Sequence, residues 1–203
     1  SCDNGYFTMY IPLPEIGEFR LIGRDNPQAL LQICELTVMT AGRLPEDFQV
    51  WEAAPEKVDL LLLSAHPDDE VLWFGGLLPT YAGERGMKVL VECNAPNSYH
   101  RRIELLDSLW TCGVRIYPVF GGYEDWLTST LEDMYKFWNK HSLQRDLTAL
   151  YRQYKPDVVV LHDKNGEYGH GAHRALSDSG RAAVALAADE TQFLESAQEY
   201  GVW

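Results

Sequence analysis

The chain has 203 residues, of which 46% are hydrophobic, and a formal net charge of −13. That length is enough for one sizeable hydrophobic core, or for one domain with an appendage. The excess of acids argues against binding to nucleic acid or to an anionic membrane surface, because both need clustered lysine and arginine.

Residues 1–52 are expected to form a small β-rich N-terminal segment. Three short runs broken by proline and glycine predict strands there: GYFTMYIPLP, GEFRLIG and LLQICELTVMT. Fifty residues with three strands seldom bury enough surface to fold alone. The segment either packs on the following domain or is the end of a carbohydrate-binding-like β-sandwich, since ICELTV resembles the last strand of discoidin-like domains.

Residues 53–203 alternate between strand-like and helix-like patterns. The run VDLLLLS is apolar on both faces, as a central parallel strand must be, and strands are also expected over 87–94, 115–120 and 155–163. Helices are expected over 75–86, 101–114, 128–154 and 171–189. The expected fold class is α/β, a Rossmann-like three-layer sandwich with a mostly parallel sheet.

Cysteine usage and hydropathy bear on the cellular compartment. Four cysteines (Cys2, Cys34, Cys93 and Cys112) are far apart and form no C-x-x-C, which is typical of reduced thiols. No apolar run approaches the roughly 20 residues needed to span a bilayer. No signal peptide is visible, and the chain begins at Ser1, so a preceding segment stays open. We therefore expect a cytoplasmic location.

Titratable residues gather after three of the predicted strands. AHPDDE follows the first strand, NAPNSYHRR the second and HDKNGEYGHGAHR the fourth. Ligands of open parallel sheets bind outside the carboxyl ends of the strands. We therefore expect these three segments to meet at one edge of the sheet and to form the functional site.

The residue types in two of these segments predict a metal site. His66 and Asp69 lie three residues apart on a tight turn, and His170 and His173 share a face at the start of a helix. One of the latter two histidines would complete a His-Asp-His set with an open position for water. Asp68, adjacent to a ligand, is then free to act as a general base.

Each of these motifs also has a purely structural interpretation. HPDDE could begin a helix, where early proline and acids are favoured. An isolated H-x-x-H usually lies on the surface without binding a metal. Arg101 with Glu104 could be an exposed ion pair, and Tyr168 could serve packing alone. Their joint occurrence at predicted carboxyl ends of strands favours a site.

AHPDDE together with GEYGHGAH resembles the PIG-L, or LmbE-like, zinc-dependent N-deacetylases, over roughly residues 57–203. The resemblance implies hydrolysis of the N-acetyl group of an N-acetylglucosamine-type sugar or conjugate, with release of acetate and a free amine. It implies Zn²⁺ as cofactor, held by His66, Asp69 and His173. Fe²⁺ would suit this ligand set nearly as well.

The resemblance also implies roles for four further residues. Asp68 matches the general base, and His170 matches a histidine that stabilises the oxyanion or protonates the leaving amine. Tyr168 matches a tyrosine that polarises the amide carbonyl. Arg101 matches an arginine that contacts the substrate.

Other functions were weighed against the deacetylase. The chain could be a non-catalytic or glycan-binding module that keeps a PIG-L-like scaffold. A serine esterase is disfavoured because no G-x-S-x-G follows a strand. A nucleotide-binding protein is disfavoured because neither G-x-G-x-x-G nor a P-loop occurs. The expected partner is a small N-acetylated sugar, without nucleic acid or membrane span, and the oligomeric state stays open.

Overall fold

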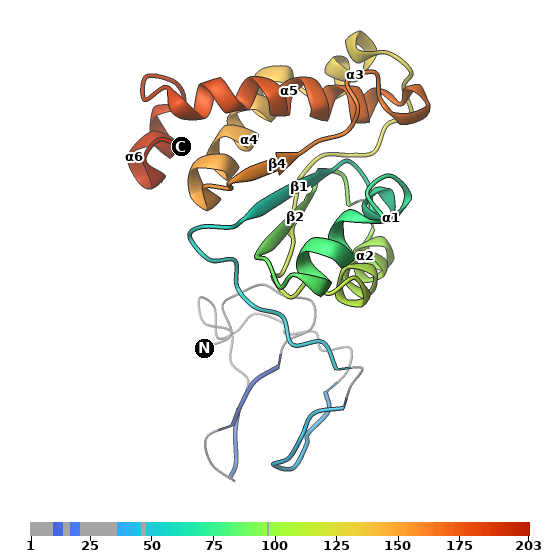
Figure 1. The fold of residues 1–203 in the computed structure, drawn as a ribbon, viewed down its shortest axis with the longest axis vertical. Helices are drawn as coiled ribbons and strands as arrows, with labels where there is room; N and C mark the ends of the chain where they lie inside the picture. The colour runs from blue at the N-terminus through green and yellow to red at the C-terminus, as the bar shows by residue number, and fades with distance from the viewer. Residues whose placement is uncertain (1–9, 14–16, 21–35, 46–47, 97) are drawn as a thin grey trace.

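The computed structural model describes residues 10–13, 17–20, 36–45, 48–96 and 98–203. Its centre is a four-stranded, all-parallel sheet of order β3-β2-β1-β4 (Figure 1). The strands are β1 (Leu60–Ser64), β2 (Val89–Cys93), β3 (Val119–Phe120) and β4 (Val158–Val160). In the register, Leu62 of β1 lies between Val91 and Val160. The predicted α/β class is therefore confirmed.

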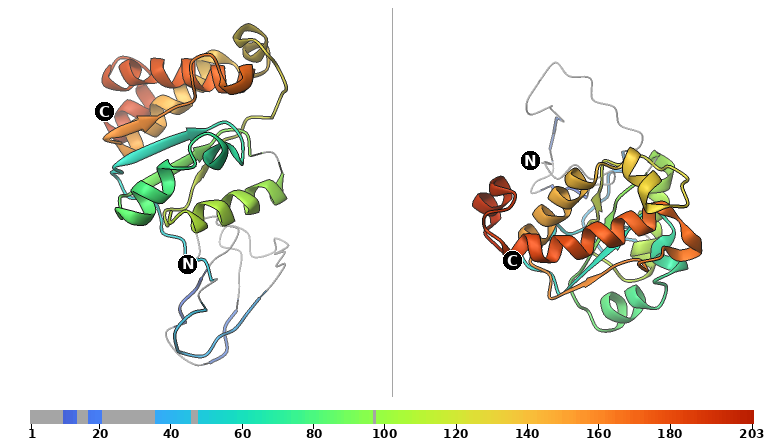
Figure 2. Two further views of the ribbon diagram at one scale, coloured as in Figure 1. Left: turned by 45° about the vertical axis from the view of Figure 1, so that its right-hand side comes forward. Right: turned by 90° about the horizontal axis from the view of Figure 1, so that it is seen from above.

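Helices cover both faces of the sheet. The helices α4 and α5 lie on one face, and η1 and α2 lie on the other (Figures 1 and 2). Before the third strand the helical elements are α1 (Asp69–Leu72), η1 (Pro79–Glu84, a π-helix) and α2 (Tyr99–Thr111). After it come α3 (Leu131–Phe137), α4 (Lys140–Tyr154), the 3₁₀ turn η2 (Glu167–Gly169), α5 (Gly171–Ala188) and α6 (Leu194–Tyr200). No helix among the described residues is long and apolar enough to cross a membrane.

The continuous apolar pattern of β1 follows from its burial on both faces. Leu61 and Leu63 pack in one core with residues of α4 and α5, while Leu60 and Leu62 pack in a second core with residues of η1 and α2. The contact with α5 is close, because a Cβ at Gly180 would lie 2.6 Å from Cδ2 of Leu161. Two covered faces hold the sheet, and the site at its edge, in one arrangement.

Three predicted elements differ from those observed, and one of them is the fourth strand, which covers 158–160 instead of 155–163. The stretch 128–154 forms two helices, because Trp138 is extended (φ −95°, ψ 103°) and Asn139 starts α4 by accepting the N–H of Ser142 at 3.0 Å. The indole of the buried Trp138 donates to the carbonyl of Glu124, so tertiary packing fixes the break. The third strand is shorter than predicted, and only Val119 and Phe120 pair with β2.

The predicted β-rich N-terminal segment is not observed in the part of it that the structure describes. Residues 10–13, 17–20 and 36–45 contain no strand, and the exposed side chains include Leu36 and Val38. Much of the three predicted runs, including residues 33–35 of ICELTV, lies outside the described residues. One isolated bridge joins Glu52 to Ile116. The domain boundary at residue 52 stays a prediction.

Candidate metal centre

The carboxyl ends of the two neighbouring strands β1 and β4 carry the candidate site. His66 lies two residues after β1, and His162 lies two residues after β4. His170 is the N-cap of α5, where its Nδ1 accepts the N–H of Ala172 at 3.2 Å, and His173 lies in the first turn. The predicted convergence of the first and fourth strand ends is thus observed.

Three consecutive acids build the turn after β1, each in a different way. Asp69 Oδ2 accepts the backbone N–H of His66 at 2.8 Å. Glu70 is buried, accepts the N–H of Asp68 at 2.8 Å and receives the hydroxyl of Ser108 at 2.5 Å. Asp68 has a left-handed backbone (φ +111°), which is costly for a residue with a side chain. Two acids therefore hold the turn together, and the strained Asp68 keeps a half-exposed carboxylate.

Three predicted ligand atoms form a nearly equilateral triangle. Asp69 Oδ2 lies 3.2 Å from His66 Nδ1 and 3.3 Å from His173 Nε2. The two nitrogens, His66 Nδ1 and His173 Nε2, are 3.3 Å apart. A tetrahedral zinc ion with bonds of about 2.0–2.1 Å separates its ligand atoms by about 3.3–3.4 Å. The three buried side chains therefore fit one tetrahedral ion with a fourth position left open.

The charge state of Asp69 suits a cation. Burial acts to raise the pKa of this carboxyl, but the polar rings of His173 and His66 at its oxygen outweigh burial and hold its pKa well below the usual range. Its second oxygen, Oδ1, accepts the indole N–H of Trp73 at 3.0 Å. The carboxylate is therefore ionised and fixed in orientation without an ion.

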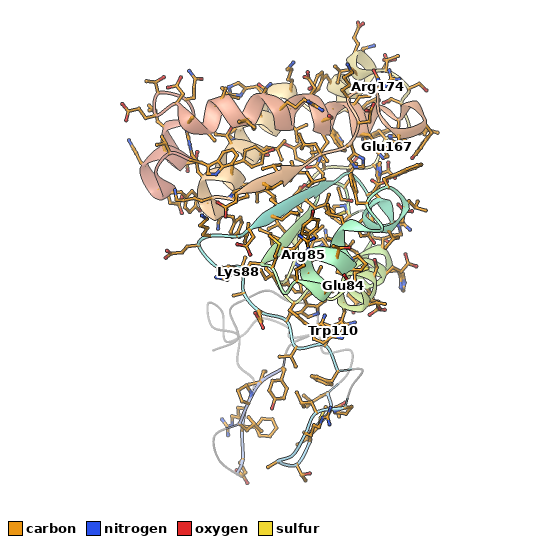
Figure 3. All side chains as sticks on the ribbon, in the orientation of Figure 1. Glu84, Arg85, Lys88, Trp110, Glu167 and Arg174 are labelled. Carbon is orange, nitrogen blue, oxygen red and sulfur yellow. The ribbon has the colours of Figure 1, made fainter. Side chains whose placement is uncertain are left out.

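Further carboxylates orient the histidine rings from outside the triangle. Glu167 Oε2 lies 2.7 Å from Nδ1 of both His162 and His173, at the edge of the sheet where α5 begins (Figure 3). Asp125 Oδ1 lies 3.2 Å from His66 Nε2. A carboxylate on the far nitrogen of an imidazole fixes its tautomer and leaves the near nitrogen free for a metal. His173 has this arrangement, whereas Nε2 of His66 lies near Asp125 without a hydrogen-bond partner among the described residues.

Two other groups of possible ligands occur among the described residues, namely His162, Glu167 and His173, and His66, Asp125 and His170. In the first, Glu167 lies at hydrogen-bond distance from both rings, which is shorter than the edge of a tetrahedral ion. Glu167 thus accepts hydrogen bonds from the two imidazoles. Burial acts to raise its pKa, but the bond from His162 and a backbone bond lower it to about 2. The triangle is the better candidate metal centre.

The remaining predicted residues surround the triangle. The ring of His170 packs edge-on against His66, with 4.8 Å between centroids. Burial, followed by the nearby His66 and His173, lowers the pKa of His170 to about 4. Tyr168 is 70% exposed, and its ring lies 5.4 Å from that of His173. The structure therefore brings both residues to the rim of the site.

Arg101 reaches the same turn from α2. Its guanidinium donates to the carbonyl of Pro67 and lies 3.0 Å from Asp68 Oδ2 and 3.4 Å from Glu104 Oε2. The expected exposed pair with Glu104 is present, but the guanidinium also holds the strained Asp68. Arg101 is therefore part of the site.

Sequence comparison identifies the family. The profile described as "PIG-L: GlcNAc-PI de-N-acetylase" matches residues 61–184, which carry the whole triangle.

The chain belongs to the PIG-L family.

Two curated relatives illustrate the similarity. A 1D-myo-inositol 2-acetamido-2-deoxy-alpha-D-glucopyranoside deacetylase 1 from Catenulispora acidiphila is 31% identical over 158 residues, which cover 64% of this chain and 49% of the relative. A deacetylase described by the same substrate, from Actinosynnema mirum, is 30% identical over 156 residues, covering 62% and 54%. The chain spans about half the length of the curated relatives it matches.

A solved structure supports the fold assignment. The N,N'-diacetylchitobiose deacetylase from Pyrococcus horikoshii matches with a TM-score of 0.57 at 22% sequence identity, over 71% of this chain and 55% of the other. At that identity the likeness concerns the fold alone. It agrees with the PIG-L assignment and with the parallel sheet described above.

Four residues of the candidate metal centre were not predicted: Trp73, Asp125, His162 and Glu167. His162 and Glu167 lie in the predicted segment after β4, and a signal for Glu167 existed, because ligating histidines usually donate to a carboxylate. Asp125 comes from the loop after β3, and nothing in the local sequence marks it. The sequence marks Trp73 only as an apolar residue. Its part in the site is apparent only from the hydrogen bond that its indole N–H donates to Asp69.

Proposed function

We propose that this chain carries a metal-dependent N-deacetylase site, which hydrolyses the N-acetyl group of an N-acetylglucosamine-type sugar or conjugate to acetate and a free amine. The observation that carries the proposal is the buried triangle of His66, Asp69 and His173, with edges of 3.2 and 3.3 Å. Membership of the PIG-L family and relatives named as deacetylases of an N-acetylated glucosaminide support the substrate class.

Zn²⁺ is the ion that we assign to the triangle, with Fe²⁺ as the alternative. When bound, the ion would lower the pKa of water towards neutrality and polarise a carbonyl oxygen. The one-carboxylate, two-imidazole donor set is common to catalytic zinc and non-haem iron sites. Metal analysis of the purified chain distinguishes the two.

Asp68 is the proposed general base, which takes a proton from the attacking water at a carboxylate oxygen. Its side chain is 46% exposed and therefore open to water, unlike the buried Asp69 and Glu70. Arg101 and the acceptor Glu70 hold the turn in its strained conformation, so the carboxylate has a fixed direction. Because Arg101 is engaged here, it acts as a positioning residue, and its direct contact with the substrate is a further proposal.

His170 and Tyr168 are the proposed groups on the oxyanion side. Nδ1 of His170 accepts the N–H of Ala172, so the ring proton of the neutral histidine is on Nε2 and can be donated. The exposed phenol of Tyr168 supplies a second donor near His170. Donors directed at a developing oxyanion stabilise the transition state more than the ground state.

Replacement of Asp68 by asparagine tests the proposal. A lost general base lowers turnover by about 10²- to 10⁴-fold, while the metal content stays that of the unmodified chain. Acetate release from N-acetylglucosamine and its glycosides measures turnover, and elemental mass spectrometry measures metal. Asp133→Asn, at an exposed acid of α3, is the matched control. Near-normal rates for Asp68→Asn would contradict the assigned base.

The rival function is a glycan-binding module without catalysis. This rival is supported only by the fold. The complete triangle of His66, Asp69 and His173 argues against a site that has lost its metal ligands. Glycan affinity that survives His66→Ala, without acetate release by the unmodified chain, would favour this rival.

A further inference from the structure

A groove borders the candidate metal centre on the side of α1 and η1. It has a volume of about 440 Å³ and is lined by six residues: Trp73, Phe74, Gly76, Leu77, Thr80 and Tyr81. The lining contains no Asp, Glu, Lys, Arg or His, and four of the six residues are aromatic or aliphatic. The groove therefore suits a ligand surface that is apolar and uncharged.

Trp73 connects the groove to the metal centre. Its indole N–H donates to Asp69 Oδ1, and its ring lies 5.6 Å from that of Tyr168. The side chains of Trp73 and Tyr168 are both exposed, so their ring surfaces are accessible at the rim. Trp73 thus contacts the triangle through Asp69 and also lines the groove.

The reacting acetamido group is small compared with the groove. An acetamido group fills little more than the open position beside the triangle of His66, Asp69 and His173. A free monosaccharide would leave most of the 440 Å³ groove to water. A group attached to the sugar could bury the apolar surfaces of Leu77 and Tyr81, which stabilises the complex in proportion to the area removed from water.

We propose that this groove binds the aglycone of the substrate, and that the aglycone presents an uncharged, apolar face such as an aryl or alkyl group. The inference rests on the proposed deacetylase function and narrows its substrate class. Conjugates of N-acetylglucosamine are then better substrates than the free sugar, and the difference comes from the groove residues.

The test compares two kinds of substrate on the same metal-reconstituted chain. We expect kcat/KM for the better of the phenyl α- and β-glycosides of N-acetylglucosamine to exceed that for the free sugar by about 10-fold or more, the size expected from burial of a few carbons. The ratio of the two values is the readout, because it does not depend on the fraction of folded or metal-loaded protein.

Two variants act on the groove in opposite ways. Leu77→Ser removes an apolar wall, and Gly76→Phe fills the space, since a Cβ at Gly76 meets no atom within 4 Å. Both should bring the ratio down to within about 2-fold of one. Leu194→Ser, at an exposed leucine of α6, is the matched control and should keep the ratio of the unmodified chain.

The possible outcomes separate the inference from the function on which it rests. Equal kcat/KM for glycoside and free sugar overturns the aglycone subsite and leaves the deacetylase intact. A preference that persists in both groove variants also overturns it, because the selectivity then arises elsewhere. No acetate from any substrate overturns the proposed function and the inference together.

Discussion

Buried acids occur in two regions of the sheet, and their surroundings differ. At the carboxyl edge, Asp69 and Glu167 each contact two or more imidazoles, and the pKa of each carboxyl is lowered. Inside the sheet, one residue before the end of β2, Glu92 is buried with Oε2 lacking a hydrogen-bond partner among the described residues. Burial, followed by the charge of Asp146, raises the pKa of Glu92 well above its usual value. Burial thus raises the pKa of Glu92, and also that of Glu70 in spite of its hydrogen bonds, whereas the neighbouring imidazoles keep Asp69 ionised and ready for a cation.

Removal of a proposed metal ligand should have the largest effect on the site at the carboxyl edge of the sheet. His173→Ala deletes one corner of the triangle, so the metal content should fall from about one ion per chain to near zero. Elemental mass spectrometry after dialysis measures it. His141→Ala, at an exposed histidine of α4, is the control and should keep its metal. Retention of the ion by His173→Ala would mean that another group of residues binds it.

A variant of Glu167 tests whether a carboxylate outside the triangle increases the affinity for metal. Glu167→Gln leaves the triangle complete but weakens the acceptor shared by the rings of His162 and His173. Metal affinity should fall by about 10- to 100-fold, as expected for loss of an outer carboxylate. Competition with a chromophoric chelator measures the affinity. An affinity equal to that of Glu132→Gln, an exposed control, would show that Glu167 has no part in binding.

Glu92 tests the other region through the pH dependence of stability. Because its pKa is raised in the folded state, the unfolded chain releases the proton first as pH rises above about 4.3, which favours unfolding. Glu92→Gln removes this cost. The variant should gain stability over the unmodified chain by up to about 1.4 kcal/mol for each pH unit over which the folded carboxyl stays protonated.

Denaturant unfolding at pH 4 to 8 measures that gain. The difference should be smallest at pH 4 and should increase with pH. Glu84→Gln, at an exposed acid of η1, should show no such trend. A difference that is constant with pH would mean that Glu92 is ionised in the folded chain.

Local sequence was sufficient where one segment determines its own structure. The apolar run before His66 predicts a doubly covered strand, and an Ala-rich pattern over 171–189 predicts α5, in which the close approach of Leu161 requires Gly180. The candidate ligand residues could be named because each belongs to a motif of four to eight residues. Their meeting followed from the rule that parallel strands end at one edge.

Tertiary partners were not predictable in the same way. The break between α3 and α4 depends on the burial of Trp138, and Asp125 reaches His66 from a loop with no motif of its own. Residues 36–40, the described part of the third N-terminal run, contain no strand, and the rest of that run lies outside the described residues. What was missed therefore depends on contacts between distant segments.

The separation of His66 and His173 along the chain has a consequence for folding. The two rings meet although 107 positions separate them in the sequence, and the intervening chain contains three of the four strands. Any ligand that bridges them acts as a reversible cross-link and stabilises only the chain in which both halves have folded. Resistance to proteolysis should therefore rise with the concentration of free metal, with β1 and α5 protected together.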